Sequence, residues 1–492
     1  MNSGVFNLLT KSSDITSVDF SDFNIWSWII QLGIIVISIL LANAIRRKVK
    51  FIRNLLLPSS VIGGSIIFIL KFIPWVKDVL IDSAFMEALT YHALGLGFVA
   101  LSMKIARIKK SKNTGTIVNC GIITVNGYLV QAILGGGVTL LLAVTLMPDL
   151  FAASGYLLPM GFGQGTGQAL NMGKIYYGFG FDNGPTFGLA IAAVGFFVAC
   201  VVGVIYMNIL KRKGKLKIGE QRDGQIPLDS NIYDVDEAPL NESVDKMTIQ
   251  IGLVIGTYLL TFLLISILSW VSENYLSEFG KNTLKPLFWG FNFLLGSVMA
   301  MLVKNVIRVL RKTKIMKHSY VNNFMMDRIS GFMFDIMIVA GIAAVDWENL
   351  TGMFWVLVIV CVLGTIGTFL YTKFVCGIIF PKYKYEAFFS IFGMLTGTAS
   401  TGMILLREID PEFETPAANN LVFQQVPAIV FGAPILLLVP LAGNAEAFMK
   451  SVNGNTSVIL LIVIGLFIVY NIILFRKHIL ELFKKTFKRK NK

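Results

Sequence analysis

Two glycine-rich stretches carry the hydroxyl and amide side chains best suited to binding a small polar ligand. Residues 161–168 read Gly-Phe-Gly-Gln-Gly-Thr-Gly-Gln, and residues 393–402 read Gly-Met-Leu-Thr-Gly-Thr-Ala-Ser-Thr-Gly. Both contain a G-x-x-x-G-T skeleton, and the second copy follows the first by 232 positions. A Gly-Ser pair repeats at the same displacement, at 64–65 and 296–297. Paired interruptions in corresponding positions of two halves of an apolar chain are the sequence sign of a transporter's binding site.

The chemistry offered by such breaks is the binding of a small anion together with a cation. Glycine lets the backbone approach a ligand closely, and non-helical backbone persists inside a bilayer only where protein or a wet cavity surrounds it. A helix N-terminus at the break suits a carboxylate, whereas free carbonyls with Thr and Ser hydroxyls suit sodium. The structural alternative is that each hydroxyl bonds to the preceding helical turn. We expect a substrate site formed by Gln164, Gly165, Thr166, Gly167, Gln168, Thr396, Gly397, Thr398, Ser400, Thr401 and Arg407.

Asp335 is the clearest acidic residue inside an apolar run, within Ser-Gly-Phe-Met-Phe-Asp-Ile-Met-Ile-Val-Ala-Gly. A charge at that depth is costly, so the side chain should face a cavity or a partner. We expect Asp335, Asn171 and Thr398 to bind the coupling cation; a buried ion pair with Arg or Lys is the alternative for Asp335. Arg407 suits bidentate binding of a substrate carboxylate, or it pairs with a neighbouring acid at the membrane surface.

The composition places the chain among polytopic membrane proteins. It has 492 residues, of which 55% are hydrophobic and only 15% are charged, and its mean hydropathy is +0.71. The net charge of +14 is explained by Lys and Arg in cytoplasmic loops, so no nucleic acid partner is expected. The four cysteines and three histidines show no ligand spacing, so we predict no metal beyond transported sodium and no cofactor. Asn126 and Gln131 are expected to form hydrogen bonds between helices.

Apolar runs of about 20 residues predict ten spanning helices in two sets of five, with one extra helix near the C-terminus. We expect no cleavable signal peptide, because the first apolar run is long enough to span. The expected helices are 25–45, 55–72, 84–103, 116–146 and a fifth starting near 185, then 247–270, 286–303, 327–345, 352–375 and 417–441. An odd number per half inverts the second half relative to the first. The glycine-rich stretches then enter from opposite faces as re-entrant hairpins, 155–172 and 391–409.

The predicted fold class is therefore an all-α polytopic membrane protein with two inverted five-helix repeats, each with a re-entrant hairpin. The protein is expected in the plasma (inner) membrane. If the basic loops lie on the cytoplasmic side, the N-terminus is outside the cell and the C-terminus is in the cytoplasm. The expected segments are an extracellular tail 1–24, repeat one 25–210, a cytoplasmic linker 211–246, repeat two 247–441, an extra transmembrane helix 456–475 and a basic cytoplasmic tail 476–492.

At these residues the chain resembles the bacterial sodium/glutamate symporter family. The family's first hairpin is of the G-G-H-G-T type, and here residues 161–166 correspond to it, with Gln164 in place of the His. The Gly-Phe at 178–179 and the Gly-Leu-Ala…Gly run at 188–195 match the helix that follows, and residues 58–64 resemble the family's P-x-x-V-x-G-G. The resemblance implies a homodimeric, elevator-type importer of glutamate coupled to sodium.

Other functions compete with this interpretation. Within the same class, the coupling ion could be a proton or the substrate another small organic anion. An ion channel with re-entrant loops is the rival from a different class, but channels form filters from rings of subunits. The glycine-rich stretch lacks the lysine and preceding strand of a phosphate-binding loop, so an ion gradient is the expected energy source. No paired acids or nucleophile with a base suggest an enzyme.

Overall fold

The fold is helical throughout the residues that the structure, a computed structural model, describes: 23–104, 114–216, 240–276, 280–315, 321–411 and 414–490. Within these ranges, nine helices are long and apolar enough to cross a membrane. They cover Trp26–Lys48, Ser83–Met103, Gly115–Thr145, Gly184–Arg212, Met247–Tyr275, Asn292–Lys312, Glu348–Ile379, Gln425–Gly443 and Val452–Arg476. The prediction of an all-α, multi-pass membrane protein is therefore confirmed.

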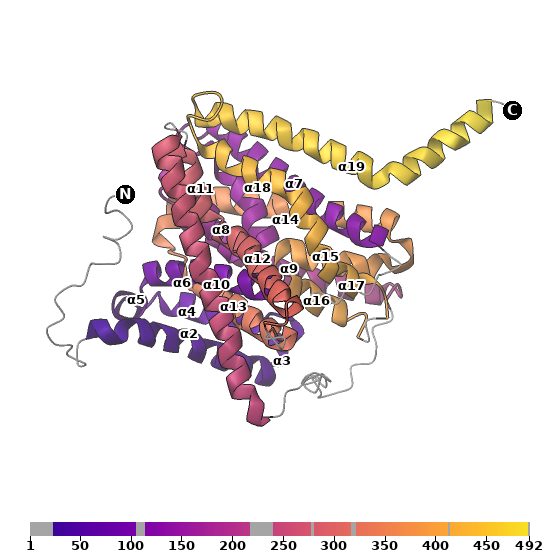
Figure 1. Ribbon diagram of the computed structural model, residues 1–492. Coiled ribbons are helices and arrows are strands. Elements are labelled where there is room, and N and C mark those ends of the chain that lie inside the picture. Colours follow the sequence, from indigo (N-terminus) through magenta and orange to yellow (C-terminus); the bar gives the residue numbers. More distant parts are fainter. Residues whose placement is uncertain are drawn as a thin grey trace.

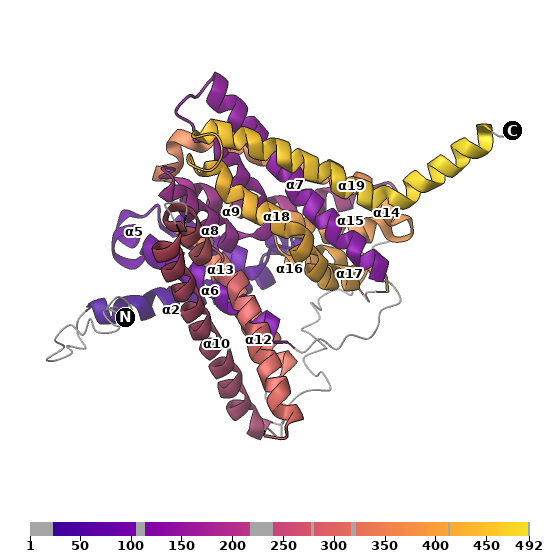
Figure 2. The same cartoon turned by 45° about the horizontal axis from the view of Figure 1, so that its top comes forward.

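The helices pack as two groups (Figure 1). We call the first bundle the set α2 (Phe23–Lys48), α4 (Ser59–Leu70), α6 (Ser83–Met103), α10 (Leu240–Tyr275), α12 (Asn292–Lys312) and α13 (Asn323–Ala344). The second bundle is α7 (Thr114–Thr145), α8 (Thr166–Gly178), α9 (Gly184–Arg212), α14 (Phe354–Ile379), α15 (Lys384–Thr396), α16 (Ala399–Arg407), α17 (Ala417–Phe423), α18 (Gln425–Gly443) and α19 (Val452–Lys490). Figure 2 shows α7, α18 and α19 on one side of the molecule and α10 with α12 on the other.

Several helix ends follow local rules that the sequence contains. The Asp82 carboxylate accepts a hydrogen bond from Ala84 N at 2.8 Å and begins α6, and Asn322 accepts from Met325 N at the start of α13. Both side chains satisfy an N–H group that has no partner inside the helix. The last turns of α2, α9 and α12 are basic, which complements the negative end of the helix dipole.

One predicted spanning helix is shorter than expected. The run 55–72 contains α4, which has 12 residues and a length of about 18 Å, against roughly 30 Å for a hydrocarbon core. The chain nevertheless returns along α2 over this segment. Ser59 Oγ donates to Asn43 Oδ1 near the C-terminal end of α2, and Asp82 N donates to Gln31 Oε1 near its start. Pro58 at the N-cap position keeps the preceding residues out of the helix.

Other boundaries also differ from expectation. The run 286–303 is two helices, α11 (Lys285–Gly290) and α12, joined at Phe291. The run 417–441 is divided at Gln424, and α19 begins before 456 and continues well past 475. Basic residues extend α12 and α19 because Lys and Arg are good helix formers. The expected tail 1–24 and linker 211–246 lie largely outside the described residues.

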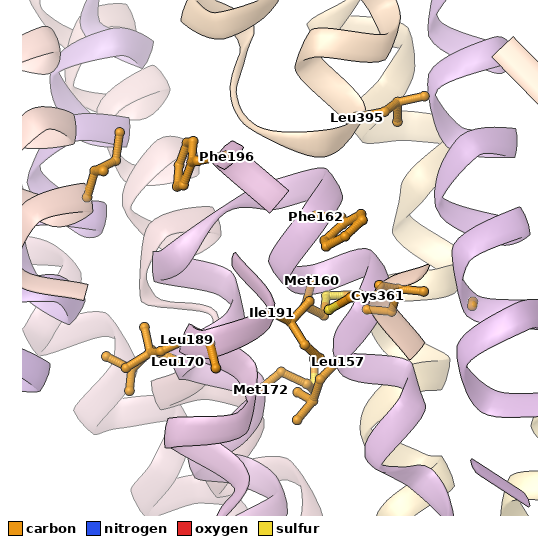
Figure 3. Close-up of a cluster of buried hydrophobic side chains, with 14 of the residues drawn as sticks. Leu157, Met160, Phe162, Leu170, Met172, Leu189, Ile191, Phe196, Cys361 and Leu395 are labelled. Carbon is orange, nitrogen blue, oxygen red and sulfur yellow. The ribbon is translucent and has the colours of Figure 1, made fainter. Parts of the chain in front are cut away.

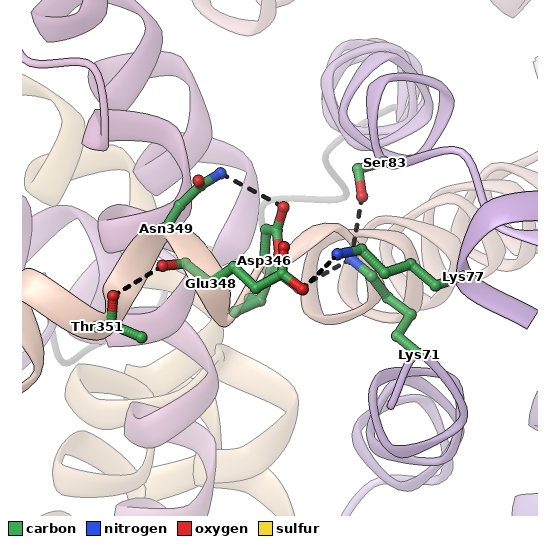
Figure 4. A network of polar contacts seen from close by, with 8 residues as sticks. Lys71, Lys77, Ser83, Asp346, Glu348, Asn349 and Thr351 are labelled. Carbon is green, nitrogen blue, oxygen red and sulfur yellow. Dashed lines mark hydrogen bonds and ion pairs between the residues drawn. The ribbon is translucent and has the colours of Figure 1, made fainter. Parts of the chain in front are cut away.

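A polar network joins the α4–α6 connection to the end of α13 (Figure 4). The buried Lys71 ammonium donates to Ala343 O at 3.1 Å, Val345 O at 2.9 Å and Ser83 Oγ at 3.0 Å. It thereby satisfies carbonyls that a helix terminus leaves unpaired. Lys71 therefore fixes the position of the α13 terminus.

Candidate functional site

The first glycine-rich stretch forms the turn between two antiparallel helical arms. The incoming arm consists of the 3-10 helix η1 (Ala152–Tyr156) and the π-helix η2 (Pro159–Gly163). It runs back along α7, because Thr139 Oγ1 donates to Ala152 O at 2.7 Å and Gly163 lies against Tyr128. At Gly165 the backbone has a φ of +84°, a conformation that glycine adopts without strain. The outgoing arm, α8, begins at the next residue.

The outgoing arm, α8, runs antiparallel to the incoming arm and packs along the first half of α9. Gly173 lies against Gly184, at the start of α9, and Ala169 against Gly188. The turn at Gly165 is close to Gly195, because Phe162 packs against that residue. Gly195 follows Gly184 by 11 residues, which corresponds to about 16 Å along the helix. The first turn is therefore positioned near the middle of α9.

The second glycine-rich stretch has the same construction. α15 ends at Thr396, Gly397 and Thr398 form the break, and α16 begins at Ala399. The two arms are antiparallel, because a Cβ atom on Gly393 would lie 2.8 Å from Gly402 Cα. Thr398 is the N-cap of α16, and its hydroxyl accepts from Thr401 N at 3.4 Å. The non-helical break is confined to Gly397 and Thr398, inside the predicted hairpin 391–409.

The two turns meet inside the second bundle. A Cβ atom on Gly165 would lie 3.8 Å from Thr398 Cγ2. A Cβ atom on Gly195 would lie 2.6 Å from Thr396 O and 3.0 Å from Phe162 Cδ1, so only glycine permits this contact. Figure 3 shows Phe162 and Leu395 of the two segments within the apolar cluster at this point. The N-termini of α8 and α16 therefore begin beside each other.

Gln131 of α7 lies between the two turns. Its Nε2 atom donates to Leu395 O of α15 at 2.8 Å and to Thr368 Oγ1 of α14 at 3.0 Å. Its Oε1 atom lies 3.2 Å from the position of a Cβ atom on Gly163. The predicted interhelical bonds of Gln131 are confirmed, but its contact with both turns was not predicted. The available signal was a carboxamide in the middle of a 31-residue apolar span, a signal that Gln131 shares with Asn126.

Residues after the first turn reach the first bundle. The buried Thr166 hydroxyl donates to Met337 O of α13 at 3.2 Å, and Gly167 lies against Met337 and Leu94. Asn171 Nδ2 donates to Gly290 O at the end of α11 at 2.6 Å. Gln168 is 2% exposed, and its amide has no hydrogen-bond partner among the described residues. Gln164 is half-buried at the end of η2.

The hydroxyls of the second turn are engaged within their own arms. Thr396 Oγ1 donates to Phe392 O at 2.8 Å, one helical turn earlier, and the hydroxyls of Thr398 and Thr401 are 3.3 Å apart. Ser400 is exposed. Thr396 thus adopts the backbone-bonded arrangement that was the structural alternative in the sequence analysis.

Asp335 and Arg407 do not lie at the meeting point of the turns. Met337 contacts the first turn, and Asp335 precedes it by two residues, which is about 200° around a helix. The Asp335 side chain is exposed and lies beside Ser60 of α4. Arg407 is in the last turn of α16, about 12 Å along the helix from its first residue, and it is exposed. Their roles in binding remain predictions.

The side chains at the meeting point are uncharged, yet the backbone there has both polarities. Two helices, α8 and α16, start at the turns with N–H groups that lack acceptors within the helix, and these favour an anion. The incoming arms end there with carbonyl groups that lack donors within the helix, and these favour a cation. The arrangement can therefore hold an anion and a cation close together without a charged side chain.

Comparison with known proteins identifies the family. The model of the sodium/glutamate symporter family matches residues 25–398, which include both turns. A search of curated proteins finds no match to the chain. The matched region covers more than half of the 492 residues, and its members are transporters rather than enzymes. The chain therefore belongs to the sodium/glutamate symporter family.

Proposed function

We propose that the protein is a secondary transporter that couples the import of glutamate to sodium by an elevator-type mechanism. The observation that carries this proposal is the meeting of the two turns, where Thr398 approaches Gly165. Two helix N-termini at one point provide donors for a substrate carboxylate. The membership of the sodium/glutamate symporter family supports glutamate as substrate and sodium as coupling ion.

The two arm pairs would be re-entrant hairpins of an inverted repeat. Each enters and leaves at one end of its neighbouring long helices and turns near their middle. Reciprocal packing supports the repeat: α4 packs on α13, and α12, which carries the second Gly-Ser pair, packs on α6. The helices α6 and α13 also pack on each other, as do α7 and α14. Such pairs are expected around a pseudo-two-fold axis in the membrane plane.

The division into two bundles supports the elevator mechanism. Both turns belong to the second bundle, and α8 and α9 make its contacts with α6 and α13 of the first. Small residues lie at this boundary, where a Cβ atom on Gly341 would lie 2.6 Å from Thr166 Cβ. The second bundle would carry the substrate past the first, which would remain fixed and form the homodimer contact.

Glutamate uptake into proteoliposomes tests the function. We expect saturable accumulation of radiolabelled glutamate that requires an inward sodium gradient. Accumulation driven by a proton gradient alone would favour proton coupling, and uptake of another carboxylate in preference to glutamate would change the substrate. Flux that only equilibrates glutamate across the membrane would contradict coupled transport and favour a channel.

In the proposed orientation in the plasma membrane, the N-terminus is outside the cell and the C-terminus is in the cytoplasm. The basic last turns of α2, α9 and α12 support a cytoplasmic position for these ends. Single cysteines at Asp229 and Asn491 should resist a membrane-impermeant thiol reagent in intact cells and react after permeabilisation. Labelling of either position in intact cells would contradict the proposed orientation. Crosslinking of the purified protein would test the dimer.

A further inference from the structure

The carboxamide nitrogen of Gln131 has two hydrogen-bond acceptors, whereas its oxygen has no partner among the described residues. The residue is fully buried, and Nε2 donates to both Leu395 O and Thr368 Oγ1. These bonds fix the orientation of the carboxamide. Its Oε1 atom has no hydrogen-bond partner among the described residues. A buried acceptor without a partner is costly, so it requires an explanation.

The surroundings of Oε1 favour a cation as its partner. The oxygen faces Gly163, the last residue of η2, and the carboxamide is anchored to Leu395, one residue before the end of α15. Both incoming arms therefore terminate beside Gln131, at helix ends whose last carbonyl groups lack donors within the helix and carry the negative end of the dipole. The amide of Gly165 in the first turn is already used, because Gly165 N donates to Gly161 O at 3.1 Å.

We propose that Gln131 Oε1 is a ligand of a monovalent cation bound between the carbonyl ends of the two incoming arms. This inference rests on the proposed function and assigns its coupling ion, sodium, to a new position. Uncharged oxygens are hard ligands that suit sodium. Divalent ions are usually held by carboxylates, and no group of three acidic, Cys or His side chains that could hold a metal occurs in the described part of the chain.

A cation at this position would join the two turns. Gln131 contacts the second turn through Nε2 and faces the first through Oε1, so an ion bound there would draw the carbonyl ends of both arms together. The N-termini of α8 and α16, which would receive the substrate, begin within three residues of those ends. Binding of the ion would therefore order the anion site, which is a direct physical route to coupling.

The matched pair Gln131→Met and Gln424→Met tests the proposal. Gln424 is equally buried, its Nε2 donates to Met394 Sδ at 3.0 Å, and its Oε1 also lacks a partner among the described residues. It lies at the α17–α18 junction. We expect Gln131→Met to raise the sodium concentration for half-maximal uptake about tenfold or more, as for loss of a contact to a charged group. Gln424→Met should leave that concentration within about twofold, below the effect of such a contact.

A second measurement does not depend on transport. Without glutamate, sodium chloride should raise the melting temperature of the purified wild type and of Gln424→Met relative to choline chloride, because an ion that binds only the folded state stabilises it. It should have no such effect on Gln131→Met. If wild type shows no sodium-dependent uptake, the proposed function fails. If it does, and Gln131→Met keeps the wild-type sodium response in both measurements, the inference alone fails.

Gln131→Glu keeps the test informative if Gln131→Met does not fold. The glutamate side chain retains an oxygen at the Oε1 position but can donate to Leu395 O only when protonated. Its sodium affinity should therefore depend on pH in a range where that of the wild type is constant. A pH-independent sodium affinity equal to that of the wild type would contradict a ligand role for this side chain.

Discussion

Replacement of Gly195 by Ala adds one methyl group at the point where both turns contact α9. The new Cβ atom would lie 2.6 Å from Thr396 O, whereas carbon–oxygen contacts are normally about 3.3–3.6 Å. The second turn must therefore move by about 0.7–1 Å. Overpacking typically costs ~1–3 kcal/mol, and Ala in place of helical Gly recovers roughly 1 kcal/mol, so the loss of stability should stay below about 2 kcal/mol.

The expected effect of Gly195→Ala on transport is much larger than its effect on stability. A displacement of about 1 Å at a binding site can reduce the rate by roughly 100-fold, so uptake per reconstituted protein should fall about 10- to 100-fold. Gly256→Ala in α10 is the control, because its Cβ would contact nothing within 4 Å. The assay is sodium-driven glutamate uptake with thermal unfolding of the same preparations. Uptake by Gly195→Ala within twofold of the control would refute the proposed role of the two turns.

Three further substitutions test separate features. Gly165→Val should abolish uptake but permit membrane insertion. A β-branched residue at a φ of +84° costs on the order of 1–3 kcal/mol and blocks the approach of a ligand. Uptake with wild-type kinetics would contradict this prediction. Asp335→Asn tests the predicted cation site on α13, which is separate from Gln131. If Asp335 binds a sodium ion of its own, the substitution should weaken the apparent sodium affinity more than it lowers thermal stability, because it removes the charge that holds the ion. Unchanged sodium dependence would contradict a cation site at Asp335. Lys71→Met should lower the free energy of unfolding by about 1–3 kcal/mol, because the carbonyls at the end of α13 lose a charged donor. Thermal unfolding measures this change, and an unchanged melting temperature would contradict the prediction.

The sequence predicted most helices because a membrane imposes a simple requirement of length and polarity. Nine helices in the described part of the chain meet this requirement. The glycine-rich breaks are predictable because Gly165 and Gly397 are poor helix formers in apolar surroundings. The helix ends were less predictable. Basic residues predict the end of the apolar part of a span, but Lys and Arg continue a helix readily, as α12 and α19 show.

The site was predicted in part. The two turns meet, as their shared skeleton suggested, but the partners of each side chain depend on packing that no single sequence reveals. Thr396 bonds to its own helix, and Gln131 contacts both turns from a third element. The sequence makes Asp335 a candidate cation ligand because it is an acidic residue inside an apolar run. The direction of its side chain depends on the rotation of α13, which the contact between Met337 and Thr166 sets and the sequence alone does not reveal.

The shortness of α4 has a consequence for the lipid around the first bundle. At about 18 Å, α4 is well below the thickness of a typical hydrocarbon core, and exposed apolar side chains follow it at Phe72, Ile73 and Trp75. Hydrophobic mismatch of this kind is relieved by local thinning of the bilayer. The lipid annulus should therefore be compressed beside α4, and uptake should be faster in liposomes of short-chain lipids than in those of long-chain lipids with the same head group.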